Sequence, residues 1–261
     1  MLIDAHAHLH MYGESLEPAL AELDQHRVFT VAVSMDDDSY RATLALAGGC
    51  PWLVATFGVH PWNAHRHSER IDDLRPLVLE TPLIGEIGLD FYFVRDRATY
   101  PAQRKVFEFF LEEAGRQDKI VNLHTKGAEA EVLAGLREFG VRRSIVHWYS
   151  GPSKLVDSYL EAGAYFTVGV EVLTSKSIQR LAKRIPEERV LTESDNPGGW
   201  RWLSGQDGMP SILVEVAARL AELRGWTPER LRRRVADNFA ALGEDDAWAV
   251  RLKALQKPAS S

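Results

Sequence analysis

The chain has 261 residues, of which 45% are apolar and 26% are charged, so it can bury a full hydrophobic core and is not intrinsically disordered. Its 31 basic and 37 acidic residues leave a formal net charge of −6, which excludes the broad positive field of a nonspecific duplex-binding protein. The single cysteine, Cys50, excludes an intramolecular disulfide and a cysteine-based metal cluster, so histidine and carboxylate side chains must hold any bound metal.

Short β-branched or apolar runs recur along the whole chain, and segments with helical periodicity separate them, an alternation typical of βα units around a parallel sheet. The predicted strands are Leu2–Ala5, Val28–Ser34, Leu53–Val59, Leu83–Ile87, Ile120–Leu123, Ser144–Val146, Ala164–Val168 and Arg189–Thr192. Eight such units in about 250 residues are the usual size of a closed (β/α)8 TIM barrel, and we predict this α/β fold. An open doubly wound sheet is the alternative, but the first strand here leads into histidines rather than a glycine-rich phosphate loop.

The clearest predicted helix is Pro101–Gln117, where apolar residues recur at three- and four-residue spacing and Pro101 suits the first turn. Glycines mark the ends of two further helices, Ala130–Phe139 and Lys154–Ala162. We assign residues 1–243 to the barrel domain, and residues 244–261 to a C-terminal helical extension whose end, Lys257–Ser261, is frayed.

The longest apolar stretches, such as Val28–Val33, fall far short of the roughly 20 residues that a membrane span requires. The opening residues, Met1–Asp4, lack the basic start of a signal peptide. The sequence therefore predicts a soluble cytoplasmic protein that does not bind a membrane. It leaves the oligomeric state open, a monomer included.

The strongest chemical signal is the pair His6 and His8 at the end of the first predicted strand. Side chains two residues apart on a strand point the same way, so both imidazoles can face one metal ion. Polar groups also stand at the ends of later strands, namely Glu86, His124, His147 and the carboxylate of Asp195. Any one of these histidines alone is more often a hydrogen-bonded core residue than a ligand.

In a barrel the C-terminal ends of the strands converge on one face, which brings these six side chains together. They suit divalent cations with nitrogen and oxygen ligands, but six exceed the three protein ligands of one catalytic zinc. The more economical arrangement is a site for two ions bridged by Glu86. The ligand set suits Zn²⁺, Mn²⁺, Co²⁺ or Ni²⁺, with Mg²⁺ less favoured by four histidines.

These residues give the chain a resemblance to the TatD family of metal-dependent deoxyribonucleases, within the amidohydrolase-like hydrolases. The matching segments run in order through nearly the whole chain, and their ordered combination is specific. They are residues 4–9 (Asp-Ala-His-Ala-His-Leu), 58–61 (Gly-Val-His-Pro), 85–92 (Gly-Glu-Ile-Gly-Leu-Asp-Phe-Tyr), 103–107 (Gln-Arg-Lys-Val-Phe), 124–126 (His-Thr-Lys), 147–151 (His-Trp-Tyr-Ser-Gly) and 193–197 (Glu-Ser-Asp-Asn-Pro).

The resemblance implies a role for each matching position. It implies that His6 and His8 hold a first metal, that Glu86 bridges, that His124 and His147 hold a second metal, and that Asp195 binds the first metal and helps activate water. It also implies that His60 and Lys126 contact substrate phosphate, although His60 beside Pro61 equally suits a role in shaping its loop.

The chain departs from the family pattern beside several of these positions. Gly127 stands where the family commonly has Asp, Trp148 and Tyr149 where it has Cys-Phe, and Ser194 where it has Thr; Asn196 and residues 198–202 also differ from the familiar continuation. The ligand positions are unchanged, so the departures concern the substrate pocket rather than metal-dependent hydrolysis.

The leading functional hypothesis is a nuclease that hydrolyses DNA phosphodiester bonds from single-stranded ends. Two divalent ions lower the pKa of a water and clamp the attacking and leaving oxygens, while Asp195 accepts the proton and Glu86 bridges. Unpaired bases stack on aromatic faces, for which Trp148 is a candidate among the aromatics expected in loops near the strand ends, which also include Trp62, Tyr149, Trp200 and Trp202. The alternatives are an amidohydrolase or esterase on a small or aminoacyl substrate, and a non-catalytic metal-binding module of a larger assembly.

Overall fold

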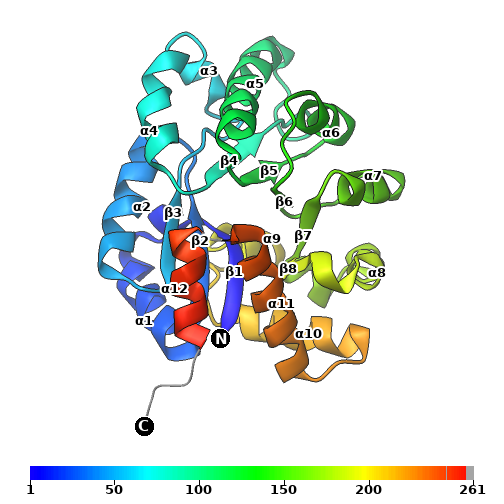
Figure 1. Ribbon diagram of the computed structural model, residues 1–261. Helices are drawn as coiled ribbons and strands as arrows, with labels where there is room; N and C mark the ends of the chain where they lie inside the picture. The colour runs from blue at the N-terminus through cyan, green and yellow to red at the C-terminus, as the bar shows by residue number, and fades with distance from the viewer. Residues whose placement is uncertain (245, 257–261) are drawn as a thin grey trace. The chain divides into compact units, whose positions relative to one another are not determined.

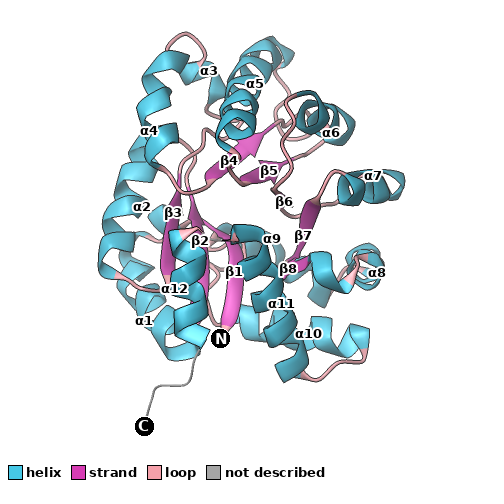
Figure 2. Ribbon diagram, viewed as in Figure 1, coloured by secondary structure: helices cyan, strands magenta, loops and turns pink. Residues whose placement is uncertain are grey.

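The computed structural model describes residues 1–244 and 246–256, and within them it contains all eight predicted strands. Helices and strands alternate along the chain, as the colours of Figure 2 show. The strands are β1 Leu2–Ala7, β2 Val28–Val33, β3 Leu53–Thr56, β4 Ile84–Gly88, β5 Val121–His124, β6 Ser144–Val146, β7 Ala164–Val168 and β8 Val190–Thr192. Each agrees with its predicted run to within three residues at either end.

The strands form two sheets, in the orders β1-β2-β3 and β4-β5-β6-β7-β8. From β4 to β7 each strand pairs in parallel with the next strand along the chain, and the register places Gly88 beside His124 and Leu123 beside Val146. The carboxyl ends of β4, β5 and β6 therefore lie at one edge of the sheet. Residues at or just beyond those ends are neighbours although they are far apart in sequence.

Helices α1 to α8 lie in the connections between successive strands, and α9 to α12 follow the last strand (Figure 1). They are α1 Leu16–His26, α2 Asp37–Gly49, α3 Ala64–His67, α4 Arg75–Glu80, α5 Tyr100–Gln117, α6 Glu129–Glu138, α7 Val156–Glu161, α8 Lys176–Arg184, α9 Gly198–Ser204, α10 Ile212–Arg224, α11 Pro228–Gly243 and α12 Ala247–Gln256. The helices predicted from glycine positions correspond to α6 and α7, and the most periodic one corresponds to α5.

The chain divides into two compact units, each built from separate segments. Unit 1 comprises residues 1–31, 50–54 and 168–261, and unit 2 comprises residues 32–49 and 55–167. In unit 1, α11 packs on β1 and β8, which lie side by side. The Phe239 ring of α11 contacts Phe29 of β2 and Trp248 of α12, with ring centroids 6.2 and 4.6 Å apart, so α12 adds to this core.

In unit 2, α5 packs on β4 and supplies a stripe of buried apolar side chains at three- and four-residue spacing. Phe110 is the centre of this stripe, and its ring lies 5.7 Å from the ring of Phe57, which in turn contacts Tyr40 at 5.2 Å. Burial of these large rings is the main stabilising term of the unit, at about 25 cal/mol per Å² of apolar surface. The packing fixes α5 against the strand that carries Glu86.

The structure differs from the sequence expectation for two tryptophans, and it does not describe the expected frayed end of the chain. The aromatics Trp200 and Trp202 were expected in a loop, but they lie on α9, which begins at Gly198 despite the adjacent glycines. The frayed end expected at residues 257–261 lies outside the described residues, and the domain boundary after residue 243 stays a prediction. Among the helices that the structure describes, none is both long enough and apolar enough to cross a membrane.

The carboxylate of Glu113, on α5, is buried and receives three hydrogen bonds. Arg75 and Arg116 donate to its two oxygens, and the Gln117 amide donates to Oε2 at 2.7 Å. Burial acts to raise the pKa of Glu113, but the bonds from Arg116 and Gln117 and the nearby positive charges outweigh it, so the pKa lies below its ordinary value. The ionised carboxylate therefore joins α5 to the start of α4.

We expect Glu113→Gln to lower the free energy of unfolding at pH 7 by about 1–3 kcal/mol, because two arginines lose a charged partner. Since the folded-state pKa is depressed, the stabilisation is present above the unfolded value of about 4.3 and is lost as the pH falls through the folded value. The difference in free energy of unfolding between parent and variant should therefore become smaller in acid. Urea denaturation at pH 7, 5 and 3.5 measures it, with the exposed neighbour Glu112→Gln as the matched control; an equal gap at all three values would contradict this account.

Candidate metal centre

The first group of candidate ligands lies in unit 1, where the end of β1 meets the segment after β8. The Nε2 atoms of His6 and His8 are 3.3 Å apart, and the Oδ1 atom of Asp195 lies 3.5 Å from the first and 3.3 Å from the second. Both histidines are buried, and Asp195 is half-buried. The predicted parallel orientation of His6 and His8 on their strand thus agrees with the structure, and the strand-eight carboxylate joins them.

The spacing of these three atoms suits a small cation. Two ligands about 2.1 Å from a tetrahedral ion lie about 3.4 Å from one another, close to all three separations. Two neutral imidazoles and one carboxylate are also the donor types that zinc and its neighbours prefer. The residues therefore fit a divalent metal.

Backbone contacts between β1 and the segment after β8 hold this group in place. The Asp195 amide donates to the His6 carbonyl at 2.9 Å, and the His8 amide donates to the Asn196 carbonyl at 2.8 Å. Asp195 has a left-handed conformation, with φ of +52°, which aspartate tolerates better than most residues.

The buried carboxylate of Asp4, to which no role was assigned from the sequence, adds side-chain hydrogen bonds with Ser194. It accepts from the Ser194 amide at 2.8 Å and from the Ser194 hydroxyl at 2.6 Å. Burial raises the pKa of Asp4 to about 7, although both Ser194 bonds act to lower it. The Asp-x-His-x-His pattern thus contains a carboxylate whose role is to fix the segment that carries Asp195.

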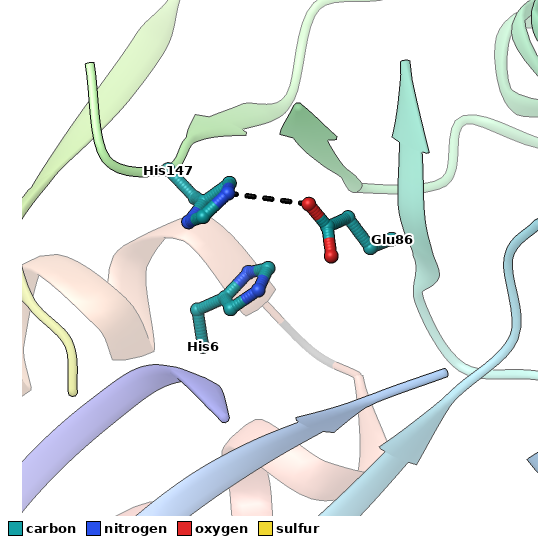
Figure 3. Close-up of side chains that lie close together, drawn as sticks. All are labelled: His6, Glu86 and His147. Carbon is teal, nitrogen blue, oxygen red and sulfur yellow. Dashed lines mark ion pairs between the residues drawn. The ribbon is translucent and has the colours of Figure 1, made fainter. Parts of the chain in front are cut away.

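The second group lies in unit 2 and centres on the buried carboxylate of Glu86, at the middle of β4. Its Oε1 atom is 2.9 Å from His124 Nδ1, 3.2 Å from His147 Nε2 and 3.5 Å from His60 Nε2. Figure 3 shows the imidazole of His147 facing this carboxylate. The predicted ligands therefore lie together on three adjacent strands, with Glu86 within β4, His124 at the end of β5 and His147 directly after β6.

His60 belongs to the same cluster, although the resemblance implied a phosphate contact for it. Its Nε2 atom lies 3.4 Å from His124 Nδ1, and its ring packs edge-on against the ring of His124 at 4.7 Å. His60, Glu86 and His124 offer three ligand atoms within 4.8 Å of one another, so they fit a cation as the first group does. His60 is thus a candidate ligand as well as a candidate substrate contact.

Asp90, two residues beyond β4, positions His124 and was not assigned a role from the sequence. Its Oδ2 atom lies 3.0 Å from Nε2 of His124, whose Nδ1 faces Glu86. Burial acts to raise the pKa of Asp90, but hydrogen bonds from His124, Trp62 and the Phe93 amide outweigh it and hold the pKa well below its ordinary value. An ionised Asp90 keeps the His124 proton on Nε2 and leaves Nδ1 as a lone-pair donor, the arrangement that supports a metal-bound histidine.

Gln103 of α5 holds the backbone of Asp90. Its side-chain Oε1 accepts from the Asp90 amide at 2.9 Å, and its Nε2 donates to the Asp90 carbonyl at 3.2 Å. Gln103 is fully buried, so this pair of bonds is shielded from water. The signal in the sequence was a polar residue within the apolar stripe of α5.

The remaining predicted substrate residues, Lys126 and Trp148, also lie together. The Lys126 ammonium donates to the Trp148 carbonyl at 2.7 Å and to the Ser150 hydroxyl at 2.9 Å, and it lies 5.7 Å from the Trp148 ring centroid. Trp148 has a positive φ of +38°, a strained conformation for a bulky residue, and its amide donates to Thr167 at 3.1 Å. Lys126 therefore restrains the loop that directly follows His147.

The chain is similar to known proteins over nearly its whole length. The family model described as TatD related DNase matches residues 3–243. The chain belongs to the TatD-related DNase family. The family resemblance seen in the motifs is confirmed, and the chain is a member of a family of metal-dependent hydrolases.

Individual TatD relatives carry different names. The protein named uncharacterized metal-dependent hydrolase YcfH, from Escherichia coli K12, is 28% identical over 94% of this chain and 97% of its own. Human deoxyribonuclease TATDN3 is 25% identical over 88% of this chain and 90% of its own. A 3'-5' ssDNA/RNA exonuclease TatD from Edwardsiella piscicida is 34% identical over 55% of this chain and 57% of its own.

Solved TatD structures show the same fold. The crystal structure of YJJV, a TatD homolog from Escherichia coli K12, has a TM-score of 0.84 at 24% identity and covers 92% of this chain and 97% of its own. A TatD family hydrolase from Entamoeba histolytica has a TM-score of 0.77 at 18% identity, with coverage of 92% and 97%. Together with the parallel sheets, these likenesses confirm the predicted α/β class, consistent with a (β/α)8 barrel.

The contact between Asp90 and His124 gives a prediction for this TatD-family chain. Asp90→Asn places an amide where the carboxylate accepts from His124, which shifts the His124 proton toward Nδ1 and blocks the ligand atom. We expect the affinity for Mn²⁺ or Zn²⁺ in the second group to fall about 10- to 100-fold. Titration calorimetry measures this change.

The matched control is Asp96→Asn, in the same loop, whose carboxylate accepts from the Ala98 amide at 3.0 Å. It removes one negative charge near the site but leaves the His124 contact intact. An Asp90→Asn protein that binds the metal as tightly as the parent would rule out the proposed role of Asp90.

Proposed function

We propose that the chain is a metal-dependent deoxyribonuclease that hydrolyses phosphodiester bonds at single-stranded DNA ends. The observation that carries the proposal is the pair of buried ligand groups, one with His6, His8 and Asp195 and one around Glu86. Buried imidazoles and carboxylates at such short distances are costly unless they hydrogen-bond or hold a cation. The names of the relatives TATDN3 and TatD point to nucleic acid as the substrate class.

In this proposal each ligand group would hold one divalent ion, and Glu86 would be the carboxylate ligand of the second group. When bound, two such ions lower the pKa of an attacking water and neutralise charge on the phosphodiester. His6 and His8 would hold the first ion together with Asp195, while His124 and His147 would hold the second. His60 completes the second group or contacts the substrate from beside it.

Asp195 accepts the proton of the attacking water. Its side chain is half-buried rather than enclosed, so it can be reached by a substrate, and its backbone is fixed by the hydrogen bond from the Asp195 amide to the His6 carbonyl. A carboxylate at the edge of a metal is within hydrogen-bond reach of the water, as a general base must be. Glu86, fully buried among histidines, suits the role of ligand instead.

Lys126 and Trp148 are the proposed contacts to DNA outside the metal ligands. The Lys126 ammonium offers positive charge to a phosphate, and the half-buried Trp148 ring offers a face to a base. The chain has a formal net charge of −6, so attraction of a polyanion must come from local charge, bound cations included. This arrangement favours a strand end entering the site over an intact duplex lying along a broad surface.

We expect His124→Ala and Asp195→Asn each to abolish hydrolysis of single-stranded DNA, because one removes a ligand and the other the proton acceptor. The matched control is His65→Ala, an exposed histidine of α3. The measurement is a time course on a 3'-labelled and a 5'-labelled oligonucleotide after reconstitution with Mn²⁺, Zn²⁺, Co²⁺, Ni²⁺ or Mg²⁺. Metal analysis should find up to two ions per parent chain.

The same panel includes duplex DNA, RNA and simple ester and amide substrates. Undiminished nuclease activity in both variants, or less than one bound ion after reconstitution, would contradict the proposal. Turnover of an amide or carboxylic ester without any hydrolysis of DNA would instead assign the site to a small-molecule hydrolase.

A further inference from the structure

Three large aromatic side chains are exposed beside the second ligand group. The exposed fractions are 47% for Trp62, 56% for Tyr92 and 42% for Phe93. Their rings contact one another edge to face, with the Trp62 and Phe93 centroids 6.4 Å apart and the Tyr92 and Phe93 centroids 4.9 Å apart. We call these three residues the aromatic platform. Large rings are usually buried, so a contiguous exposed set suggests a ligand that covers it.

Asp90 ties the aromatic platform to a candidate metal ligand. Its Oδ2 atom accepts from the Trp62 indole at 2.7 Å, and its Oδ1 atom accepts from the amides of Tyr92 at 3.0 Å and Phe93 at 2.7 Å. The same carboxylate contacts His124 Nε2 at 3.0 Å. Each ring therefore belongs to a residue that is one hydrogen bond from the carboxylate that positions His124.

Two further contacts hold the platform close to the connection after β5. The Phe91 amide donates to the Lys126 carbonyl at 2.8 Å. A Cβ atom on Gly127, which has a φ of +71°, would lie 3.1 Å from the Tyr92 nitrogen. The rings are thus placed before any ligand arrives, so binding to them costs little ordering entropy.

Charge beside the platform favours one class of ligand. The Arg95 guanidinium lies 5.6 Å from the centroid of the Tyr92 ring, and Arg95 is exposed. Flat rings with an adjacent guanidinium match unpaired nucleobases and the phosphates between them. A phosphate held at the second ligand group would place the neighbouring nucleotides of its strand within reach of these rings.

We propose that the aromatic platform stacks the unpaired bases next to the phosphate that is hydrolysed, with Arg95 contacting a phosphate farther along the strand. This inference rests on the proposed nuclease function. It adds that the site recognises unpaired bases in the substrate. Stacking tolerates any base, so the platform selects single strands without selecting sequence. Replacing both Tyr92 and Phe93 by alanine should weaken binding of a single strand by about tenfold or more.

The test compares two single-stranded oligonucleotides of equal length, one ordinary and one with three abasic residues at the end that is digested. Phosphorothioate linkages slow hydrolysis, so fluorescence anisotropy reports equilibrium binding. We expect the parent to bind the ordinary strand about tenfold more tightly than the abasic strand. The double variant Tyr92→Ala/Phe93→Ala, which keeps only the Trp62 ring, should lose most of this preference, whereas Tyr92→Phe/Phe93→Tyr, which keeps all three rings, should discriminate as the parent does.

The matched control for lost exposed apolar surface is Leu79→Ala, an exposed leucine of α4, which should behave as the parent. Metal content and urea denaturation show that each variant is folded and loaded. Equal affinity of the parent for ordinary and abasic strands overturns the inference, as does full discrimination by the alanine double variant.

Hydrolysis of unmodified strands is measured separately, so the two proposals fail in different ways. A parent that binds ordinary strands more tightly than abasic strands and releases no nucleotides supports the platform and contradicts the nuclease function. A parent that hydrolyses ordinary and abasic strands with the same KM supports the nuclease and contradicts the platform. If both the nuclease function and the platform are correct, the Tyr92→Ala/Phe93→Ala variant has a KM about tenfold higher than the parent on the ordinary strand.

Discussion

The second ligand group depends on the hydrogen bonds that the buried carboxylate of Asp90 accepts. Four donors converge on its two oxygens, from His124, Trp62 and the amides of Tyr92 and Phe93. An ionised carboxylate away from water is stable only when its lone pairs are used in this way. Meeting that requirement fixes the tautomer of His124 and the loop after β4 together, so the candidate metal ligand and the exposed rings are placed by one group.

The candidate metal ligands lie on strands or close to strand ends, whereas the residues of the aromatic platform lie on the loops. Each group combines one carboxylate with imidazoles, Asp195 in one and Glu86 in the other, so a bound divalent ion leaves either group with net positive charge. This local charge offsets the −6 of the whole chain where an anionic substrate would bind. Ligand atoms come from strands or their immediate ends, while residues with exposed faces, such as Trp62 and Tyr92, come from the connections.

The strands and the residues at their ends could be predicted from the sequence, whereas their supporting contacts could not. Side-chain alternation and apolar runs are local signals, and parallel pairing brings His124 and His147 to one edge without further information. The role of Asp90 depends on Trp62, 28 residues before it in a loop, and on His124, 34 residues after it in β5, so no local pattern contains it. Helix α9 was missed for a similar reason, because tertiary packing overrides the low helical propensity of Gly198 and Gly199.

The departure at Gly127 shows how the loops change while the ligands remain. A Cβ atom at this position would lie 3.1 to 3.2 Å from the backbone of Phe91 and Tyr92, and a φ of +71° favours glycine over all side chains, aspartate and asparagine being those that tolerate it best. An aspartate at this position would therefore need the backbone of Phe91 and Tyr92 to yield by a few tenths of an ångström. His124, three residues earlier, lies within β5, where pairing with β4 holds its backbone. Glycine at 127 thus allows the connection after β5 to pack closely on the backbone that leads into the aromatic platform.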